Sequence, residues 1–411
     1  MEVITLNCIL KQGDTISYDF SVTKGLQKYF TGKPFTINYA ENIECVPEGI
    51  LAVPFVGSII PIVWLTHCEL RLNTLDKAFY ECLPNLKKGY ETMFPESQFG
   101  GNIKVEELTD SVEMFTPHCA MFYSGGVDSM YTFINHLNER PDLLSIWGSD
   151  IKYENETGWK LVHQAIEEAA EKCGLPETFF HSTFREFDDE GVLHAEFSRQ
   201  LKDGWWHGVK HGIALLSHVA PYAYLHHITK MYIASSHCPE DGPVRCASNP
   251  LTDNQVKFVN CQVVHDGFEN SRQKKLKKII DFNIKEKLYL PLHVCWESQS
   301  GGNCCHCEKC YRTIVGILAE NEDPSKYGFN NWKKEMIEMR KYLVENKNRY
   351  AEAYSSYWAH ISERIREQSN NLKYKTYWKD IEWIGKTDFK NIDSIKLDLK
   401  YRIYRKLSQI I

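Results

Sequence analysis

One short segment of the chain has the residue types and order of a phosphate-binding loop, Ser124-Gly125-Gly126-Val127-Asp128-Ser129. This glycine loop (residues 124–129) follows an apolar, strand-like run at 119–123 and precedes a helical pattern that extends to about residue 137. Two adjacent glycines let the backbone approach an anion closely. The N–H groups of the loop and of the first helical turn would then converge where the helix dipole also favours negative charge.

The side chains of the glycine loop indicate which anion it would bind. The hydroxyls of Ser124 and Ser129 can donate hydrogen bonds to phosphate oxygens, whereas the Asp128 carboxylate needs a cation between itself and a polyphosphate, which predicts Mg²⁺. The segment lacks the lysine of the G-x-x-x-x-G-K-[ST] loop and the spacing of G-x-G-x-x-G. Asp128 and Ser129 are the candidate catalytic residues.

A second segment has the spacing of a metal site, C-x8-C-x2-C-x2-C, formed by Cys295, Cys304, Cys307 and Cys310. Four thiolates at these intervals can close a tetrahedral zinc site that stabilises the fold and has no open position. An iron–sulfur cluster and a thiol-redox pair are the alternatives. Two further residues inside the segment, Cys305 and His306, could substitute as ligands, but the spacing favours the four named cysteines.

At all six positions the glycine loop resembles the S-G-G-x-D-S loop of the N-type ATP pyrophosphatase (PP-loop) superfamily. The resemblance implies a HUP-like α/β fold and cleavage of ATP between the α and β phosphates, which adenylates a substrate. It assigns ATP binding to all six residues of the loop, Ser124, Gly125, Gly126, Val127, Asp128 and Ser129.

The two motifs together, in this order, resemble the QueC (7-cyano-7-deazaguanine synthase) family, in which a PP-loop domain precedes a zinc knuckle of the same cysteine spacing. Trp147 and Gly148 stand where the family's second strand ends in a Tyr-Gly pair. His207 and Gly208 stand where the family has a turn near AMP, and Arg312 also fits the pattern. The resemblance covers about residues 116–320 and implies that Trp147, Gly148, His207 and Gly208 contact ATP.

The chain departs from the family on the substrate side, where the Y-P-D-C-R stretch is missing. His237, Arg245, His265 and Asp266 are the substrate candidates by position, and Arg272 is a further one. His207 and His211 could share a helix face and contact the nucleotide or the acceptor, or simply cap the core; a two-histidine metal site is less favoured. The basic run at 272–278 is expected to form an exposed helix face, and attraction of phosphate is the alternative.

The family resemblance implies a ligase that adenylates a carboxylate, 7-carboxy-7-deazaguanine, and joins it to an amine. The additional segments before and after the matched region are similar to those of QueC-like proteins in the Qat and type IV CBASS anti-phage operons, where the acceptor is a partner protein's amine. Ammonia as acceptor would instead lead to 7-cyano-7-deazaguanine. The alternatives are a PP-loop tRNA-modifying enzyme and a non-catalytic ATP-binding partner module.

The elements around these motifs must position them, and their pattern predicts an α/β fold. Strand-like runs at 119–123, 143–147, 178–181 and 231–235 alternate with helical patterns at 128–137, 159–173 and 211–228. Such alternation predicts a doubly wound parallel sheet with ligands at the carboxyl ends of its strands. The first 115 residues, with strand-like runs at 3–10, 16–22 and 34–39, a longer apolar run at 51–65 and a helix at 75–93, look like a separate unit.

The predicted organisation therefore has three parts. An N-terminal α+β accessory domain covers residues 1–115, and a PP-loop domain covers residues 116–330 and contains the zinc knuckle at 295–310. A helical extension covers residues 331–411. The extension holds 18 Lys and Arg against 11 Asp and Glu, whereas the net charge of the whole chain is −6. A solvated helical cap is the favoured interpretation of this basic tail, and a surface for an acidic partner is the alternative.

Composition and charge limit the partners and the compartment. No apolar run is long enough for a membrane helix, and the first residues do not have the pattern of a secretory signal. Clustered cysteines in such a chain favour metal binding in a reducing compartment, which predicts a cytoplasmic location. The negative net charge argues weakly against nucleic acid as a partner, whereas the basic tail leaves RNA binding as an alternative.

Overall fold

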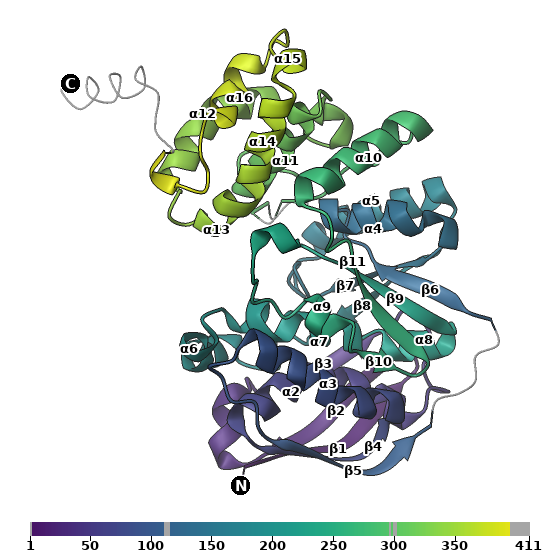
Figure 1. The fold of residues 1–411 in the computed structure, drawn as a ribbon. Coiled ribbons are helices and arrows are strands. Elements are labelled where there is room, and N and C mark those ends of the chain that lie inside the picture. Colours follow the sequence, from purple (N-terminus) through teal and green to yellow (C-terminus); the bar gives the residue numbers. More distant parts are fainter. Residues whose placement is uncertain (1, 111–115, 296, 299–301, 395–411) are drawn as a thin grey trace.

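The computed structural model describes residues 2–110, 116–295, 297–298 and 302–394. They form an α/β fold around one eleven-stranded, mostly parallel sheet in the order β10-β11-β9-β6-β7-β8-β3-β2-β1-β4-β5 (Figure 1). The strands are β1 (Val3–Gln12), β2 (Thr15–Val22), β3 (Phe35–Asn38), β4 (Glu69–Asp76), β5 (Asn102–Thr109), β6 (His118–Phe122), β7 (Asp142–Trp147), β8 (Glu177–Ser182), β9 (Ile228–Ala234), β10 (Lys257–Phe258) and β11 (Cys261–Asp266).

The middle of the sheet is parallel and its strand order reverses once. From β6 the chain proceeds to β7 and β8 on one side, then returns to place β9 and β11 on the other side of β6. The point between β6 and β9 is therefore the topological switch point, where open α/β sheets form a crevice at the carboxyl ends of their strands. This part confirms the predicted alternation of strands and helices.

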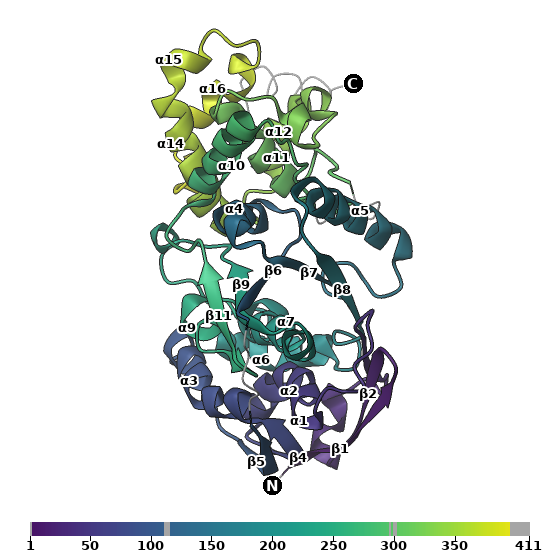
Figure 2. The same cartoon turned by 90° about the vertical axis from the view of Figure 1, so that its right-hand side faces the viewer.

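Helices cover both faces of this parallel part (Figures 1 and 2). On β6, Met121 packs into the core beneath α4, α5 and α10, whereas its neighbour Ala120 packs into the core shared with α7 and α8. This alternation is the period of two expected of a strand buried on both faces. The helices are α4 (Val127–His136), α5 (Glu156–Cys173), α6 (Glu190–Leu201), α7 (His211–Ser217), α8 (Ala220–Leu225), α9 (Pro250–Asp253), α10 (Arg272–Glu286) and α11 (Glu308–Ala319).

The helix expected at 211–228 is interrupted. A π-helical turn (Trp206–Lys210) leads into α7, and α8 begins anew at Ala220. Pro221 lies in the first turn of α8, where its missing N–H costs nothing, but it would break a continuous helix. The final part of the predicted helix is strand, because β9 already begins at Ile228.

The N-terminal strands continue the same sheet. The expected boundary near residue 115 falls between β5 and β6, yet β3 pairs antiparallel with β8 through Ile37 and Asn38. The apolar run at 51–65 forms the buried helix α2 (Val53–Thr66), which follows the short α1 (Glu48–Leu51) and contacts α7. Helix α3 (Lys77–Met93) contacts β10 near one end of the sheet and β5 at the other, so the sheet curves around these helices (Figure 2).

Two buried polar groups lie in the core on the α7 side of the sheet. His218 is fully buried; its Nδ1 donates to the Ala214 carbonyl at 2.6 Å, and its Nε2 lies 2.9 Å from the Ser182 hydroxyl. Nearby, the fully buried ammonium of Lys210 lies 2.7 Å from Asp188 Oδ1. These pairs satisfy groups that would otherwise be costly to bury.

The described part of the C-terminal extension is helical, as predicted, and packs on α10 and α11 (Figure 1). Residues 395–411 of the predicted extension lie outside the described residues. Within the described residues no helix is both long and apolar enough to cross a membrane. The helices are α12 (Trp332–Glu345), α13 (Ala351–Ala353), a π-helical turn (Tyr354–Trp358), α14 (Ala359–Glu367), α15 (Ser369–Leu372) and α16 (Trp378–Gly385).

Candidate functional site

The glycine loop lies at the carboxyl end of β6, at the switch point of the sheet, and leads directly into α4. Gly125 has a φ of +71°, the left-handed region in which glycine is favoured. Gly126 is the N-cap residue of α4, and no side chain caps the helix there. The first amides of α4 therefore have no side-chain acceptor, and the positive end of the helix dipole adds to their attraction for an anion.

Hydrogen bonds within the loop fix its shape. The hydroxyls of Ser124 and Ser129 lie 3.1 Å apart, and Ser129 Oγ also donates to the Gly126 carbonyl at 3.2 Å. From outside the loop, the backbone N–H of His293 donates to the Gly125 carbonyl at 2.8 Å. The two predicted phosphate donors thus lie together, on a loop that is held by a segment far away in the sequence.

Cationic side chains surround the only carboxylate of the loop. Arg272 forms an ion pair with Asp128, and Lys275 Nζ lies 3.5 Å from Asp128 Oδ1; both cations come from α10. Lys275 also donates to the Ser235 carbonyl at 2.5 Å, which links Asp128 to the residue that follows β9. In this structure the carboxylate expected to hold Mg²⁺ is therefore paired with two side-chain cations.

The site carries more positive than negative charge. Burial alone would raise the pKa of Asp128, but the charges of Arg272, Lys275 and Arg312 hold it below its ordinary value. Burial and the nearby charge of Arg312 lower the pKa of Lys309, which indicates that the cations repel one another. An anion with several charges would relieve this repulsion, so the electrostatics favour a multiply charged anion.

The C-terminal extension reaches this site. The Arg312 guanidinium lies 4.2 Å from the centre of the Tyr357 ring, and the Tyr357 hydroxyl donates to the Ser236 carbonyl at 3.1 Å. A small pocket beside the loop is lined by Val127, Arg272, Gln273, Leu276, Arg312, Thr313, Tyr357 and Ile361. The extension thus forms part of the wall of the candidate site.

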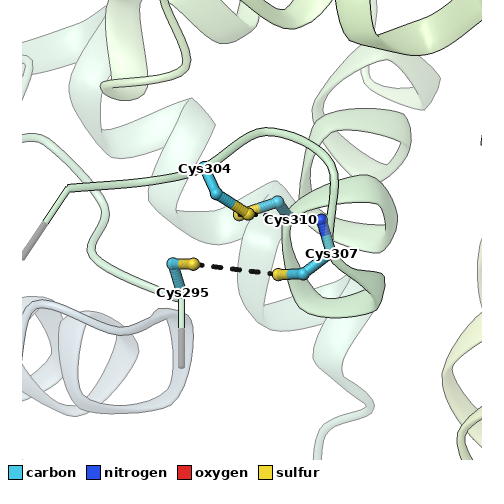
Figure 3. Close-up of side chains that lie close together, drawn as sticks. All are labelled: Cys295, Cys304, Cys307 and Cys310. Carbon is cyan, nitrogen blue, oxygen red and sulfur yellow. Dashed lines mark hydrogen bonds between the residues drawn. The ribbon is translucent and has the colours of Figure 1, made fainter. Parts of the chain in front are cut away.

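The four predicted cysteine ligands meet at the start of α11 (Figure 3). The sulfur atoms of Cys295 and Cys307 lie 3.8 Å apart, as do those of Cys304 and Cys310. Cys307 and Cys310 are fully buried, and the Cys304 sulfur accepts the N–H of Cys307 at 3.3 Å. Four thiolates at such distances fit a tetrahedral ion such as zinc.

The two alternative ligands of this segment lie elsewhere. Cys305 has a φ of +63°, and its thiol contacts the Asn303 carbonyl at 3.7 Å. His306 is exposed, and its ring lies 3.9 Å from Glu335. The four cysteines that the spacing predicted therefore form the cluster, and Cys305 and His306 lie outside it.

The cysteine cluster and the glycine loop are physically connected. The Asn303 side chain, next to Cys304, donates to the Leu292 carbonyl at 2.7 Å and accepts the N–H of Val294 at 3.1 Å. Between these two residues lies His293, whose N–H holds the Gly125 carbonyl. A metal in the cluster would thus stabilise the segment that braces the loop.

Trp147 and Gly148 lie at the carboxyl end of β7. The Trp147 ring stacks on His181, with ring centres 3.7 Å apart, and its Nε1 donates to the Lys152 carbonyl. Gly148 has a φ of +107°, and a Cβ there would lie 1.9 Å from the Ser182 carbonyl oxygen, so only glycine fits. Trp147, which the resemblance assigns to ATP binding, therefore lies at the end of β7 with its ring stacked on that of His181.

His207 and Gly208 belong to the π-helical turn, and His207 lies beside His237, which follows β9. These two histidines form a group with Cys246, whose thiol is buried. Of the predicted substrate residues, His237 is thus the one that lies beside a predicted ATP contact, His207.

The other substrate candidates have partners of their own. Arg245 donates to Glu96 at 3.0 Å and to the Leu201 carbonyl at 3.3 Å. His265 is buried, with its Nδ1 2.8 Å from Asp253 Oδ2. Asp266 accepts the Thr132 hydroxyl at 2.7 Å and contacts His136. Their hydrogen bonds give these three residues structural roles.

Sequence reasoning missed Lys309, Tyr357 and Cys246, and it considered Lys275 only as part of the basic run at 272–278. The expectation that 272–278 forms an exposed helix face is wrong in part: the run is helical, but Gln273, Lys275 and Leu276 are buried. The spacing of Leu276, Ile279 and Ile280 marks the buried face of α10, and Lys275 and Arg272 flank it. That periodicity was the available signal for Lys275; no signal of this kind pointed to Tyr357.

Comparison of the chain with known proteins identified no relative. No protein-family model, no curated protein and no solved structure matches the chain.

Proposed function

We propose that this chain is an ATP-dependent, QueC-like enzyme of the PP-loop type that adenylates a carboxylate and transfers it to an amine. The observation that carries the proposal is the glycine loop at the switch point of the sheet, with Arg272, Lys275, Lys309 and Arg312 around its single carboxylate. A cradle of backbone amides with an excess of positive charge suits a triphosphate better than a neutral ligand.

In the proposed reaction the substrate carboxylate attacks the α phosphorus of ATP. The bond between the α phosphorus and the bridging oxygen breaks, so pyrophosphate leaves and an acyl-adenylate forms. The amides and hydroxyls of the glycine loop and the cations of α10 and α11 would stabilise the charge that develops on the pyrophosphate. Asp128 is the carboxylate that would hold Mg²⁺, which neutralises part of the triphosphate charge when bound.

An amine then attacks the acyl carbon and displaces AMP, which gives an amide. We propose 7-carboxy-7-deazaguanine as the carboxylate, on the resemblance of the two motifs to the QueC family. The acceptor is an amine of a partner protein in anti-phage defence; with ammonia instead, a second ATP would convert the amide to the nitrile. The cysteine cluster acts as a structural zinc site beside this chemistry.

The test is release of pyrophosphate from ATP by the purified chain with 7-carboxy-7-deazaguanine and ammonium. We expect Asp128→Asn to slow release about 100-fold, the scale of losing one preorganised charged contact. The matched control is Asp281→Asn, which removes an exposed carboxylate on α10. Equal rates for both variants would remove the role given to Asp128, and ATP binding without pyrophosphate release would instead support a non-catalytic module.

A further inference from the structure

A second group of metal-ligand side chains lies outside the cysteine cluster. One ligand atom each of His207, His237 and Cys246 falls within 4.8 Å of the other two. The residues come from three segments: the π-helical turn before α7, the loop after β9, and the loop before α9. Cys246 is only 3 % exposed, whereas the His207 side chain is 47 % exposed, so solvent can reach one side of the group.

A carboxylate lies beside one ring nitrogen of each of the two histidines, so the other ring nitrogen is the one that could bind a metal. His207 Nδ1 donates to Asp203 Oδ2 at 2.6 Å, and His237 Nδ1 faces Asp241 Oδ2 at 3.8 Å. A carboxylate beside one ring nitrogen orients the ring, and a metal displaces the proton of the other nitrogen when it binds. Metal-binding histidines in proteins nearly always have such an outer partner.

A third histidine completes the surroundings of the thiol. His211 Nδ1 donates to the Trp206 carbonyl at 3.1 Å, because a carbonyl can only accept. Its Nε2 therefore has a lone pair and lies 3.8 Å from Cys246 Sγ. The thiolate is the form that metals bind.

Backbone hydrogen bonds hold the three segments together. The N–H of Ala247, next to Cys246, donates to the His207 carbonyl at 2.7 Å. The Ser235 hydroxyl donates to the His237 carbonyl at 2.8 Å. Both connections act on the residue that carries a ligand or on its immediate neighbour, so the group is preorganised before any ion arrives.

We propose that His207, His237 and Cys246 bind one divalent transition-metal ion, zinc by the chemistry of the donors, as a second metal site separate from the four-cysteine cluster. Two imidazoles and one thiolate are borderline-soft donors that suit zinc rather than magnesium or calcium. Three protein ligands with access to solvent leave a fourth position for water or a substrate atom, the arrangement of catalytic rather than structural zinc.

The position of this second site relates it to the glycine loop. His237 follows β9 and the loop follows β6, and these neighbouring parallel strands end at the same edge of the sheet. Lys275 connects the two ends, since it contacts both Asp128 and the Ser235 carbonyl. An ion held here would lie at the end of β9, beside the end of β6 that carries the glycine loop.

The test is the metal content of the purified full chain, measured by mass spectrometry of the elements after exhaustive dialysis. We expect about two zinc ions per chain. Cys246→Ala should lose one of them, and Cys261→Ala, which truncates an equally buried cysteine outside both groups, should lose none. His207→Gln should also weaken binding of the second ion. Because His207 is exposed, this substitution should not unfold the chain, so unfolding would not explain the loss of the ion.

Cobalt provides a readout that is independent of activity and of ATP. With Co²⁺ in place of zinc, the sites should show thiolate-to-metal charge-transfer absorption that falls in Cys246→Ala by the contribution of one Cys–Co bond. One zinc per chain in the unaltered protein, together with rapid alkylation of Cys246 in its native state, would overturn the proposal and identify a free thiolate instead. Neither result depends on whether the chain cleaves ATP.

Discussion

The two glycines of the loop allow a sharp test, because they differ in conformation and share the same chemistry. Gly125 has a φ of +71°, whereas Gly126 has a φ of −71°. A Cβ at Gly125 would lie 3.4 Å from His293 Cβ, and one at Gly126 would lie 3.4 Å from Ser124 Oγ; both are ordinary contacts. Replacement by alanine therefore costs no clash at either position, and only the backbone conformation distinguishes the two variants.

The magnitude follows from the dihedral angle. A left-handed conformation costs a residue with a Cβ about 1 to 2 kcal/mol, whereas φ near −71° costs nothing. Alanine also lowers the entropy of the unfolded chain, by about 0.4 to 1 kcal/mol, but equally in both variants. Gly125→Ala should therefore be less stable than Gly126→Ala by about 1 to 2 kcal/mol.

Urea unfolding monitored by tryptophan fluorescence measures this difference. If the chain relieves the strain at the alanine of Gly125→Ala by rotating the peptide, the loop loses its native conformation. ATP binding must then supply the free energy that returns the loop to this conformation. Calorimetric titration should then show ATP binding weakened about 5- to 30-fold in Gly125→Ala, the equivalent of the same free energy. Equal stabilities of the two variants would refute the argument from φ, and undiminished ATP affinity would refute the role of the loop geometry.

Three further predictions concern the rest of the fold. Burial lowers the pKa of His218 from 6.5 to about 4, so its contribution to stability is complete above pH 6.5 and is lost as the pH falls toward 4. The loss amounts to about 3 kcal/mol, and the pH dependence of urea unfolding should flatten in His218→Asn but not in the exposed His194→Asn. Lys210→Met should destabilise the fold by about 3 to 5 kcal/mol by leaving Asp188 unpaired, and adding Asp188→Leu should recover most of it in the same urea assay. Removing the metal from the cysteine cluster with a chelator should weaken ATP binding, because it frees the segment that braces Gly125; unchanged affinity by calorimetry would contradict that connection.

The sequence was most informative where the determinants are local. The glycine loop and the cysteine spacing each lie within a few residues, and the strands at 119–123 and 143–147 are short apolar runs with clear limits, so all four features could be predicted. Pro221 marks the break between α7 and α8 but was read as part of one longer helix. Strands β4 and β5 were missed although the sequence carried their signal: Leu70 and Leu72 in β4, and Ile103 and Val105 in β5, alternate with polar residues.

Features that depend on distant pairing could not be predicted from one sequence. No local pattern indicates that β3 pairs with β8, which lies about 140 residues further along the chain. The group of His207, His237 and Cys246 has spacings that match no common metal motif, because a π-helical turn and two separate loops bring it together. Likewise, Tyr357 reaches the loop only through the packing of the helical extension on α10 and α11.

The pairing of β3 with β8 has a practical consequence for anyone who wishes to isolate the nucleotide-binding half. A truncated chain that begins near residue 116 would expose the outer edge of β8, together with the apolar surface of α7 that α2 now covers. An unpaired strand edge beside an apolar patch promotes association between copies. Such a fragment should precipitate or form oligomers on its own, and supplying residues 1–110 as a separate polypeptide should return it to solution.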